Sequence, residues 1–123
     1  MQIPILKQGP ILIISIQTIV GDQDLISLKE ELAIKVGEHR SKGVIIDVTT
    51  LDVLDSFSTR TLQNIAATVR LRGAETVIVG IQPDVAFAMV ELGLKLNDIK
   101  TALNLEDGIL LLNRHFEEKD NEL

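Results

Sequence analysis

Cysteine and most aromatic residues are missing from this chain of 123 residues. Cysteine, tryptophan and tyrosine are absent, and aromatic residues make up 2% of the composition. Without cysteine the chain forms no disulfide, thiol nucleophile or cysteine-ligated zinc site, and this absence fits a reducing compartment. Because 46% of the residues are hydrophobic, we expect an ordinary folded domain with a core of aliphatic side chains.

Positive charge is also scarce. Twelve lysine and arginine residues stand against eighteen aspartate and glutamate residues, which gives a net charge of −6. Clustered cations are what bind phosphate backbones and anionic membrane surfaces, so we expect neither nucleic acid nor a membrane as a partner. The chain also has no apolar run of about 18 residues and no signal peptide at its start. We therefore expect a cytoplasmic protein.

Hydrophobic periodicity predicts one α/β domain over residues 1–123. Two short apolar runs, at 3–6 and 10–17, predict a hairpin that turns at Gly9. Further strands are predicted at 44–48, 76–81 and 98–103. Helical stripes lie between these strands and after the last one, which gives four to five helices. Such alternation favours a single mixed sheet, mostly parallel, with the hairpin as an antiparallel edge.

Local signals mark where the helices begin and end. Asp22 or Asp24 is predicted as the first N-cap, and Ser56 as the second if that helix begins near Phe57. Pro83 is predicted to open a third helix. Glycines at positions 73 and 93 are predicted to stop the second and third helices.

Polar residues follow three of the predicted strands. They are Asp22, Asp24, Asp47, Asp52, Asp55, Ser56 and Gln82. Sites in open α/β sheets form at the carboxyl ends of strands, so these residues are candidates for one shared polar face. Such a face suits recognition or phosphoryl chemistry. The alternative interpretation is that they are helix caps and solvated loop residues.

The sequence contains no complete catalytic motif. It lacks a phosphate-binding loop, a dinucleotide-binding glycine motif, a zinc-protease motif and a nucleophile elbow. His39 and His115 lie near predicted helix C-termini, where an imidazole interacts with the last carbonyl groups. We therefore expect no enzyme activity, no cofactor and no metal site.

Ser56 is the most informative hydroxyl of the chain. A phosphate on this side chain would add a charge of about −1.5 to −2 at the start of a helix, close to Asp52 and Asp55. A partner docked at this end would meet new charge and new bulk together, which is the physics of a binding switch. Ser58 and Thr59 are competing acceptors that would point in other directions.

Several ordered segments resemble the STAS-domain family over nearly the whole chain. They are "GVIIDVTTLDVLDSF", "RGAETVIVGIQPDVAFAMVELG" and "KTALNLEDGILLL". The opening "IPIL", the "DSF" and the "GIQP" together resemble the RsbS-like scaffold branch found in the bacterial stressosome. Each fragment alone is a weak signal, but the ordered set is specific.

This resemblance implies a regulatory Asp-Ser pair at Asp55 and Ser56, with Ser56 as the phosphate acceptor. Asp22, Asp47, Ser58, Thr59 and Gln82 would surround it or contact partners. The implied partners are RsbR-type STAS sensor proteins, an RsbT-like serine/threonine kinase and an RsbX-like phosphatase. The chain would form dimers and join a large complex that holds the kinase until phosphorylation releases it.

Two alternatives stay open. An anti-sigma-factor antagonist would bind an anti-sigma kinase directly, but that branch carries Ser-Gly after its Asp-Ser pair, whereas Phe57-Ser58 follow here. A receiver-like domain phosphorylated on Asp47 is suggested by the acid at a strand end. The opening hairpin and the lack of an evident lysine after the last strand weigh against this second alternative.

Overall fold

The computed structural model describes residues 3–17, 21–93 and 99–121, and it shows strands alternating with helices as predicted. The elements are β1 (Ile5–Gln8), β2 (Ile11–Ser15), α1 (Asp22–His39), β3 (Gly43–Asp47), α2 (Ser56–Leu71), β4 (Glu75–Val79), α3 (Pro83–Glu91), β5 (Ile99–Ala102) and α4 (Leu105–Asn121). The first residue of the strand predicted at 98–103 lies outside the described residues. No helix in the described ranges is long and apolar enough to cross a membrane.

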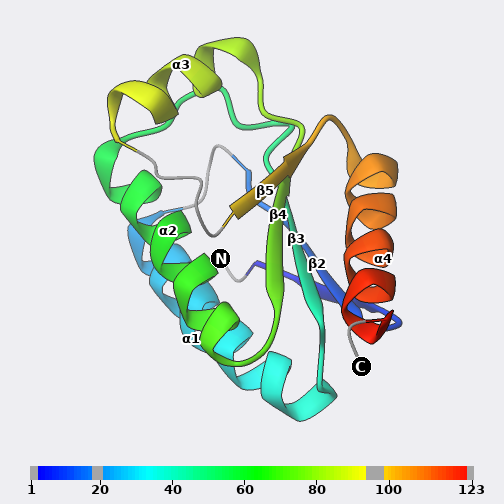
Figure 1. Cartoon of the computed structure of the whole chain (residues 1–123). Coiled ribbons are helices and arrows are strands. Elements are labelled where there is room, and N and C mark those ends of the chain that lie inside the picture. Colours follow the sequence, from blue (N-terminus) through cyan, green and yellow to red (C-terminus); the bar gives the residue numbers. More distant parts are fainter. Residues whose placement is uncertain (1–2, 18–20, 94–98, 122–123) are drawn as a thin grey trace.

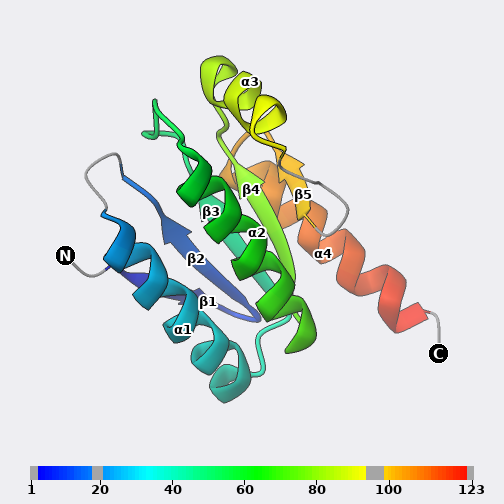
Figure 2. The same cartoon turned by 90° about the vertical axis from the view of Figure 1, so that its left-hand side faces the viewer.

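The five strands form one sheet in the order β1-β2-β3-β4-β5. Strand β1 is antiparallel to β2, and the other neighbouring pairs are parallel. Helices α1 and α2 cover one face of the sheet and α4 covers the other (Figure 1). Figure 2 shows α1 and α2 side by side in front of the sheet. The predicted α/β fold with a mixed sheet and an antiparallel edge is confirmed.

Strand β3 lies at the centre of the core. Val44, Ile45 and Ile46 are fully buried because the strand has helices on both of its faces. Val44 and Ile46 belong to the cluster formed with α1 and α2, whereas Ile45 packs in the cluster under α4. The continuous apolar run of β3 is therefore what a strand covered on both faces requires.

The hairpin is shifted from its predicted position. The first strand was predicted at 3–6, but β1 covers Ile5–Gln8 and pairs Ile5 with Ile14. Lys7 follows the predicted run 3–6, yet it lies in the strand, and Gly9 turns the chain with a φ of 57° as predicted. An edge strand exposed to solvent accepts polar side chains, which is why the apolar pattern failed to mark its end.

The predicted caps of the first two helices were wrong by one to three residues. Gly21 is the N-cap of α1, and Asp24 accepts a hydrogen bond of 3.3 Å from the Gly21 N–H. Asp55, not Ser56, is the N-cap of α2. Pro83 stands in the first turn of α3, as predicted.

Candidate functional site

Asp47 ends β3 in a satisfied turn. Its Oδ1 atom accepts hydrogen bonds from the Thr49 backbone N–H at 2.9 Å and from the Thr49 hydroxyl at 2.5 Å. These bonds compensate a carboxylate that follows a buried apolar strand. They also fix the start of the connection between β3 and α2, residues 48–55, which we call the switch loop.

The switch loop is held from the β4 side by Gln82. The Gln82 side-chain amide donates to the Thr49 carbonyl oxygen at 2.6 Å. Gly80 has a φ of 77°, and a Cβ atom at this position would overlap the Thr49 side chain. Thr49 therefore joins Asp47, Gly80 and Gln82 into one packed unit at the carboxyl end of the sheet.

The switch loop is also held from the β2 side. The Thr50 hydroxyl lies 2.9 Å from Gln17 Oε1 and 3.4 Å from the Ile16 carbonyl oxygen. Leu51 and Leu54 are buried beneath the loop. The loop is thus hydrogen-bonded to residues that follow both neighbouring strands, and its leucines pack in the core. These contacts define where α2 begins.

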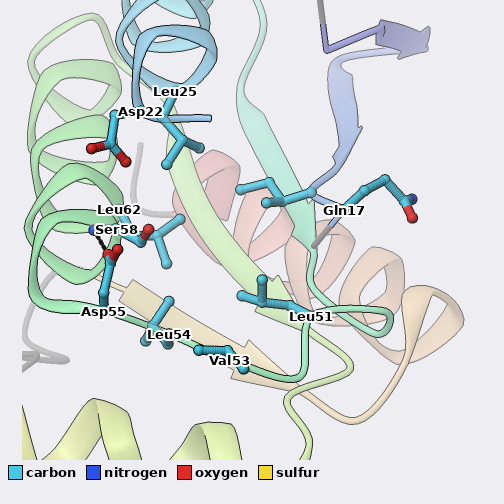
Figure 3. Close-up of a pocket in the computed structure, with 10 residues that line it drawn as sticks. Gln17, Asp22, Leu25, Leu51, Val53, Leu54, Asp55, Ser58 and Leu62 are labelled. Atoms are coloured by element: carbon cyan, nitrogen blue, oxygen red, sulfur yellow. Dashed lines mark hydrogen bonds between the residues drawn. The ribbon is translucent and has the colours of Figure 1, made fainter. Parts of the chain in front are cut away.

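Asp55 starts α2 as its N-cap. Asp55 Oδ1 accepts a hydrogen bond of 2.7 Å from the Ser58 N–H, shown as a dashed line in Figure 3. Donation from the Ser58 N–H and from the Ser58 hydroxyl lowers the pKa of the Asp55 carboxyl below its ordinary value. The carboxylate therefore stays ionised at neutral pH and secures the first turn.

The structure places the three neighbouring hydroxyls in different surroundings. Ser56 is the first helical residue and is exposed. Ser58 is half-buried and turns toward a pocket. Thr59 is 1% exposed, and its hydroxyl donates to the Asp55 carbonyl oxygen at 2.9 Å. Ser56 is therefore accessible from solvent without unfolding of the helix, whereas Thr59 is not.

A pocket of about 160 Å³ lies beside the start of α2 (Figure 3). It opens between the beginnings of α1 and α2, the end of β2 and the switch loop. Six of its ten lining residues are aliphatic, and Gln17, Asp22, Asp55 and Ser58 supply polar groups. The lining residues are Ile16, Gln17, Asp22, Leu25, Leu51, Val53, Leu54, Asp55, Ser58 and Leu62.

The pocket brings together some predicted site residues and leaves others out. Asp22 and Asp55 come from the starts of two adjacent helices and line it together, whereas Ser56, Asp47 and Gln82 do not line it. No role was predicted for the aliphatic side chains of the switch loop. The available signal was the set of four aliphatic residues in this segment, Val48, Leu51, Val53 and Leu54, which are interspersed with polar ones.

The histidines lie away from this end. His39 is the last residue of α1 and is exposed, and His115 Nε2 lies 3.6 Å from Glu75 Oε1 at the start of β4. Both positions are at the amino end of the parallel strands, opposite the switch loop. Within the described ranges, no three His, Asp or Glu side chains gather in a way that could hold a metal ion.

A family model for the STAS domain matches residues 2–108. The chain belongs to the STAS-domain family. The match agrees with the sheet and helix order above and confirms the family predicted from the sequence.

One named relative shares a region with this chain. Over 99 residues the chain is 34% identical to the RsbT co-antagonist protein RsbRA of Bacillus subtilis (strain 168). This match covers 78% of the chain but 36% of RsbRA, so the chain spans about a third of that relative's length.

Two solved structures resemble the whole chain. A serine-to-glutamate variant of Moorella thermoacetica RsbS is 37% identical with a TM-score of 0.85, and the match covers 95% of this chain and 99% of RsbS. A chain from a structure of the stressosome, described as a signal integration and transduction hub, is 40% identical with a TM-score of 0.81. That match covers 90% of this chain and 96% of the other. The predicted resemblance to RsbS is confirmed.

Proposed function

We propose that the protein is a non-enzymatic scaffold switched by phosphorylation of Ser56. In the unmodified form it holds an RsbT-like serine/threonine kinase within an assembly of RsbR-type STAS proteins. Phosphorylation of Ser56 by that kinase releases it, and an RsbX-like phosphatase resets the system. Regulation of a general stress response follows from the release.

The observation that carries this proposal is the position of Ser56. Its hydroxyl is exposed at the first helical position of α2, directly after the cap formed by Asp55. The anchored switch loop and the Asp55 cap hold the backbone of Ser56 in one place. A serine that is both exposed and fixed is a suitable acceptor for a kinase that returns repeatedly to the same surface.

The partners are supported by the relatives. RsbRA is described as a co-antagonist of RsbT, which supports an RsbT-like kinase as the protein being held. The likeness to a stressosome chain over 90% of this chain supports co-assembly with RsbR-type proteins in a large complex. The Moorella RsbS variant, which carries glutamate in place of a serine, resembles this chain with a TM-score of 0.85, so this fold is compatible with such a carboxylate.

The acidic surroundings support release by phosphate. Asp22 and Asp52 are exposed at the same end as Ser56, so this surface suits a partner with basic side chains. A phosphate on Ser56 would add negative charge and volume to the surface where the partner docks. The N-terminus of a helix favours negative charge, so α2 would stay folded. The fold would stay the same while the docking surface changes.

Phosphate mapping tests the acceptor. The protein is incubated with ATP and the RsbT-like kinase of the same genome, and mass spectrometry locates the phosphate. We expect one phosphate at Ser56 and none in a Ser56→Ala variant, whereas a Ser58→Ala variant is still modified. Phosphate found only on Ser58 or Thr59 would show that the site assignment is wrong.

A binding assay tests release. The dissociation constant of the kinase is compared for wild type, Ser56→Asp and Ser56→Asn, where asparagine matches the shape of aspartate without its charge. We expect Ser56→Asp to bind at least about tenfold more weakly, equivalent to about 1.4 kcal/mol. Equal binding by all three proteins would contradict release by charge.

The antagonist alternative differs in the size of the assembly. A scaffold forms a very large species when mixed with its RsbR-type paralogue, whereas an anti-sigma-factor antagonist forms a small complex with an anti-sigma kinase. Light scattering after gel filtration separates these outcomes. The receiver alternative is disfavoured, because the family match is to STAS domains and Asp47 Oδ1 already accepts two hydrogen bonds from Thr49.

A further inference from the structure

Ser56 and Arg60 lie one helical turn apart on the solvent face of α2. Four residues of α-helix advance about 6 Å and rotate by roughly 40° beyond one full turn, so these two side chains are neighbours. Both residues are exposed, while Leu62, Ile65 and Val69 hold the opposite face in the core. Ser58 lies on the pocket side instead.

Arg60 has no partner among the described residues. No hydrogen bond or ion pair engages its side chain there, in contrast to Arg70, which lies 3.6 Å from Glu75 Oε1 near the other end of the helix. A guanidinium group offers five donors, and here none of them is occupied by a described residue.

Arg60 is an exception among the starts of the helices, which otherwise carry acidic side chains. In the described residues, the first two turns of the four helices carry one cationic side chain, that of Arg60. The acidic residues in the same turns are Asp22, Asp24, Asp84, Glu106 and Asp107. Asp55 lies five residues before Arg60 and directs one carboxylate oxygen to the Ser58 N–H instead.

We propose that Arg60 is the internal counter-ion of phosphate on Ser56. This inference rests on the proposed function, because it assigns a role to Arg60 in the modified state. The phosphate oxygens and the guanidinium group pair along the exposed face of α2. Arg60 is a positioning residue that orients the phosphate and takes no part in its transfer.

The chemistry of the two groups supports pairing. A phosphate presents three strong acceptor oxygens, and arginine binds phosphate through two parallel N–H donors. An anion four residues before a cation is the favourable order on a helix. The pair directs the phosphate down the helix face and away from the pocket, so a partner meets an oriented dianion.

Phosphorus NMR tests the pair directly. Phosphoserine is incorporated at position 56 during translation, and its second ionisation, with an ordinary pKa of about 6, is followed from pH 4.5 to 8. A neighbouring cation stabilises the dianion and lowers this pKa. We expect Arg60→Gln to raise it by about 0.2 to 0.4 units relative to the unsubstituted protein, which corresponds to an i,i+4 ion pair on a helix.

Two further variants complete the experiment. Arg114→Gln removes an exposed arginine from α4 and should leave the phosphoserine pKa unchanged. Arg60→Lys retains the charge and should recover at least half of the shift. If Arg60→Gln and Arg114→Gln give the same pKa within 0.1 units, the proposed pair is overturned.

The result is independent of any kinase because the phosphoserine is placed genetically. Failure of a kinase to modify Ser56 would overturn the proposed function and would leave this measurement intact. The ionic-strength dependence gives a second readout. The difference caused by Arg60→Gln should shrink by at least half between about 0.05 and 0.5 M salt, since exposed pairs are screened, and an undiminished difference would contradict direct pairing.

Discussion

The Ser58 N–H donates a hydrogen bond of 2.7 Å to the Asp55 carboxylate, and this bond makes Asp55 the residue that starts α2. The serine proposed to accept phosphate therefore stands inside the helix instead of capping it. Its hydroxyl is free for modification while a separate side chain secures the first turn. Asp55 thus has the structural role of the cap, and its neighbour Ser56 has the proposed role of phosphate acceptor.

Replacing Asp55 tests its structural part. Asp55→Ala removes the oxygen that accepts from Ser58 and should lower the free energy of unfolding by about 1 kcal/mol. Asp55→Asn keeps an N-cap acceptor and should cost no more than a few tenths of a kcal/mol. Urea unfolding at pH 7 measures both variants. Equal losses for alanine and asparagine would show that capping by Asp55 contributes little.

The pH dependence of stability gives a second test at Asp55. Its pKa is lower in the folded protein than the ordinary value of about 3.9, so its stabilising contribution is complete above that value. The contribution is lost as the pH falls through the lowered pKa of the folded state. The unfolding free energy of wild type relative to Asp55→Asn should therefore decline between pH 5 and pH 2.5. A difference that stays constant over this interval would contradict the prediction.

Gly80 should be the more sensitive of two glycines with positive φ. Gly80→Ala strains the backbone and places a methyl group on Thr49, whereas Gly73→Ala strains the backbone but meets open space. We expect a loss of about 2 to 3 kcal/mol for Gly80→Ala and about 1 kcal/mol for Gly73→Ala. Thermal and urea unfolding give these values. A smaller loss at Gly80 than at Gly73 would show that Thr49 moves aside without cost.

Asp22 should contribute to partner binding through charge. Asp22 lines the pocket, whereas Asp84 occupies the first turn of α3 and does not. For the proposed kinase, Asp22→Asn should weaken binding about two- to fivefold at low salt, as expected for an exposed ion pair. Asp84→Asn removes a comparable charge and should leave affinity unchanged. Equal effects of the two variants would indicate that the net charge of the protein affects binding and that Asp22 makes no specific contact.

The order of strands and helices could be predicted because each element has a clear period. Strand β3 was found from its apolar run, and α2 from the spacing of Leu62, Ile65 and Val69. The end of β1 could not be found, since Lys7 sits on an exposed edge where polarity carries no information about pairing. Apolar patterns locate buried segments better than exposed ones.

The surroundings of the three hydroxyls could not be predicted from the sequence. The apolar stripe predicts which way the later side chains of the helix face, but it does not show which residue is the N-cap. Asp55 and Ser56 are both suitable cap residues, so only the hydrogen bond from the Ser58 N–H assigns the cap to Asp55 and places Ser56 inside the helix. The pocket was equally hidden, because its walls come from segments that are distant in sequence and meet only after folding.

Strand β1 has a consequence for assembly. It forms one edge of the sheet, is four residues long, and carries the exposed side chains of Lys7 and Gln8. Short edges that carry lysine resist the addition of further strands. We therefore expect subunits not to extend the sheet across this edge, so that contacts made here can be exchanged without breaking shared main-chain hydrogen bonds.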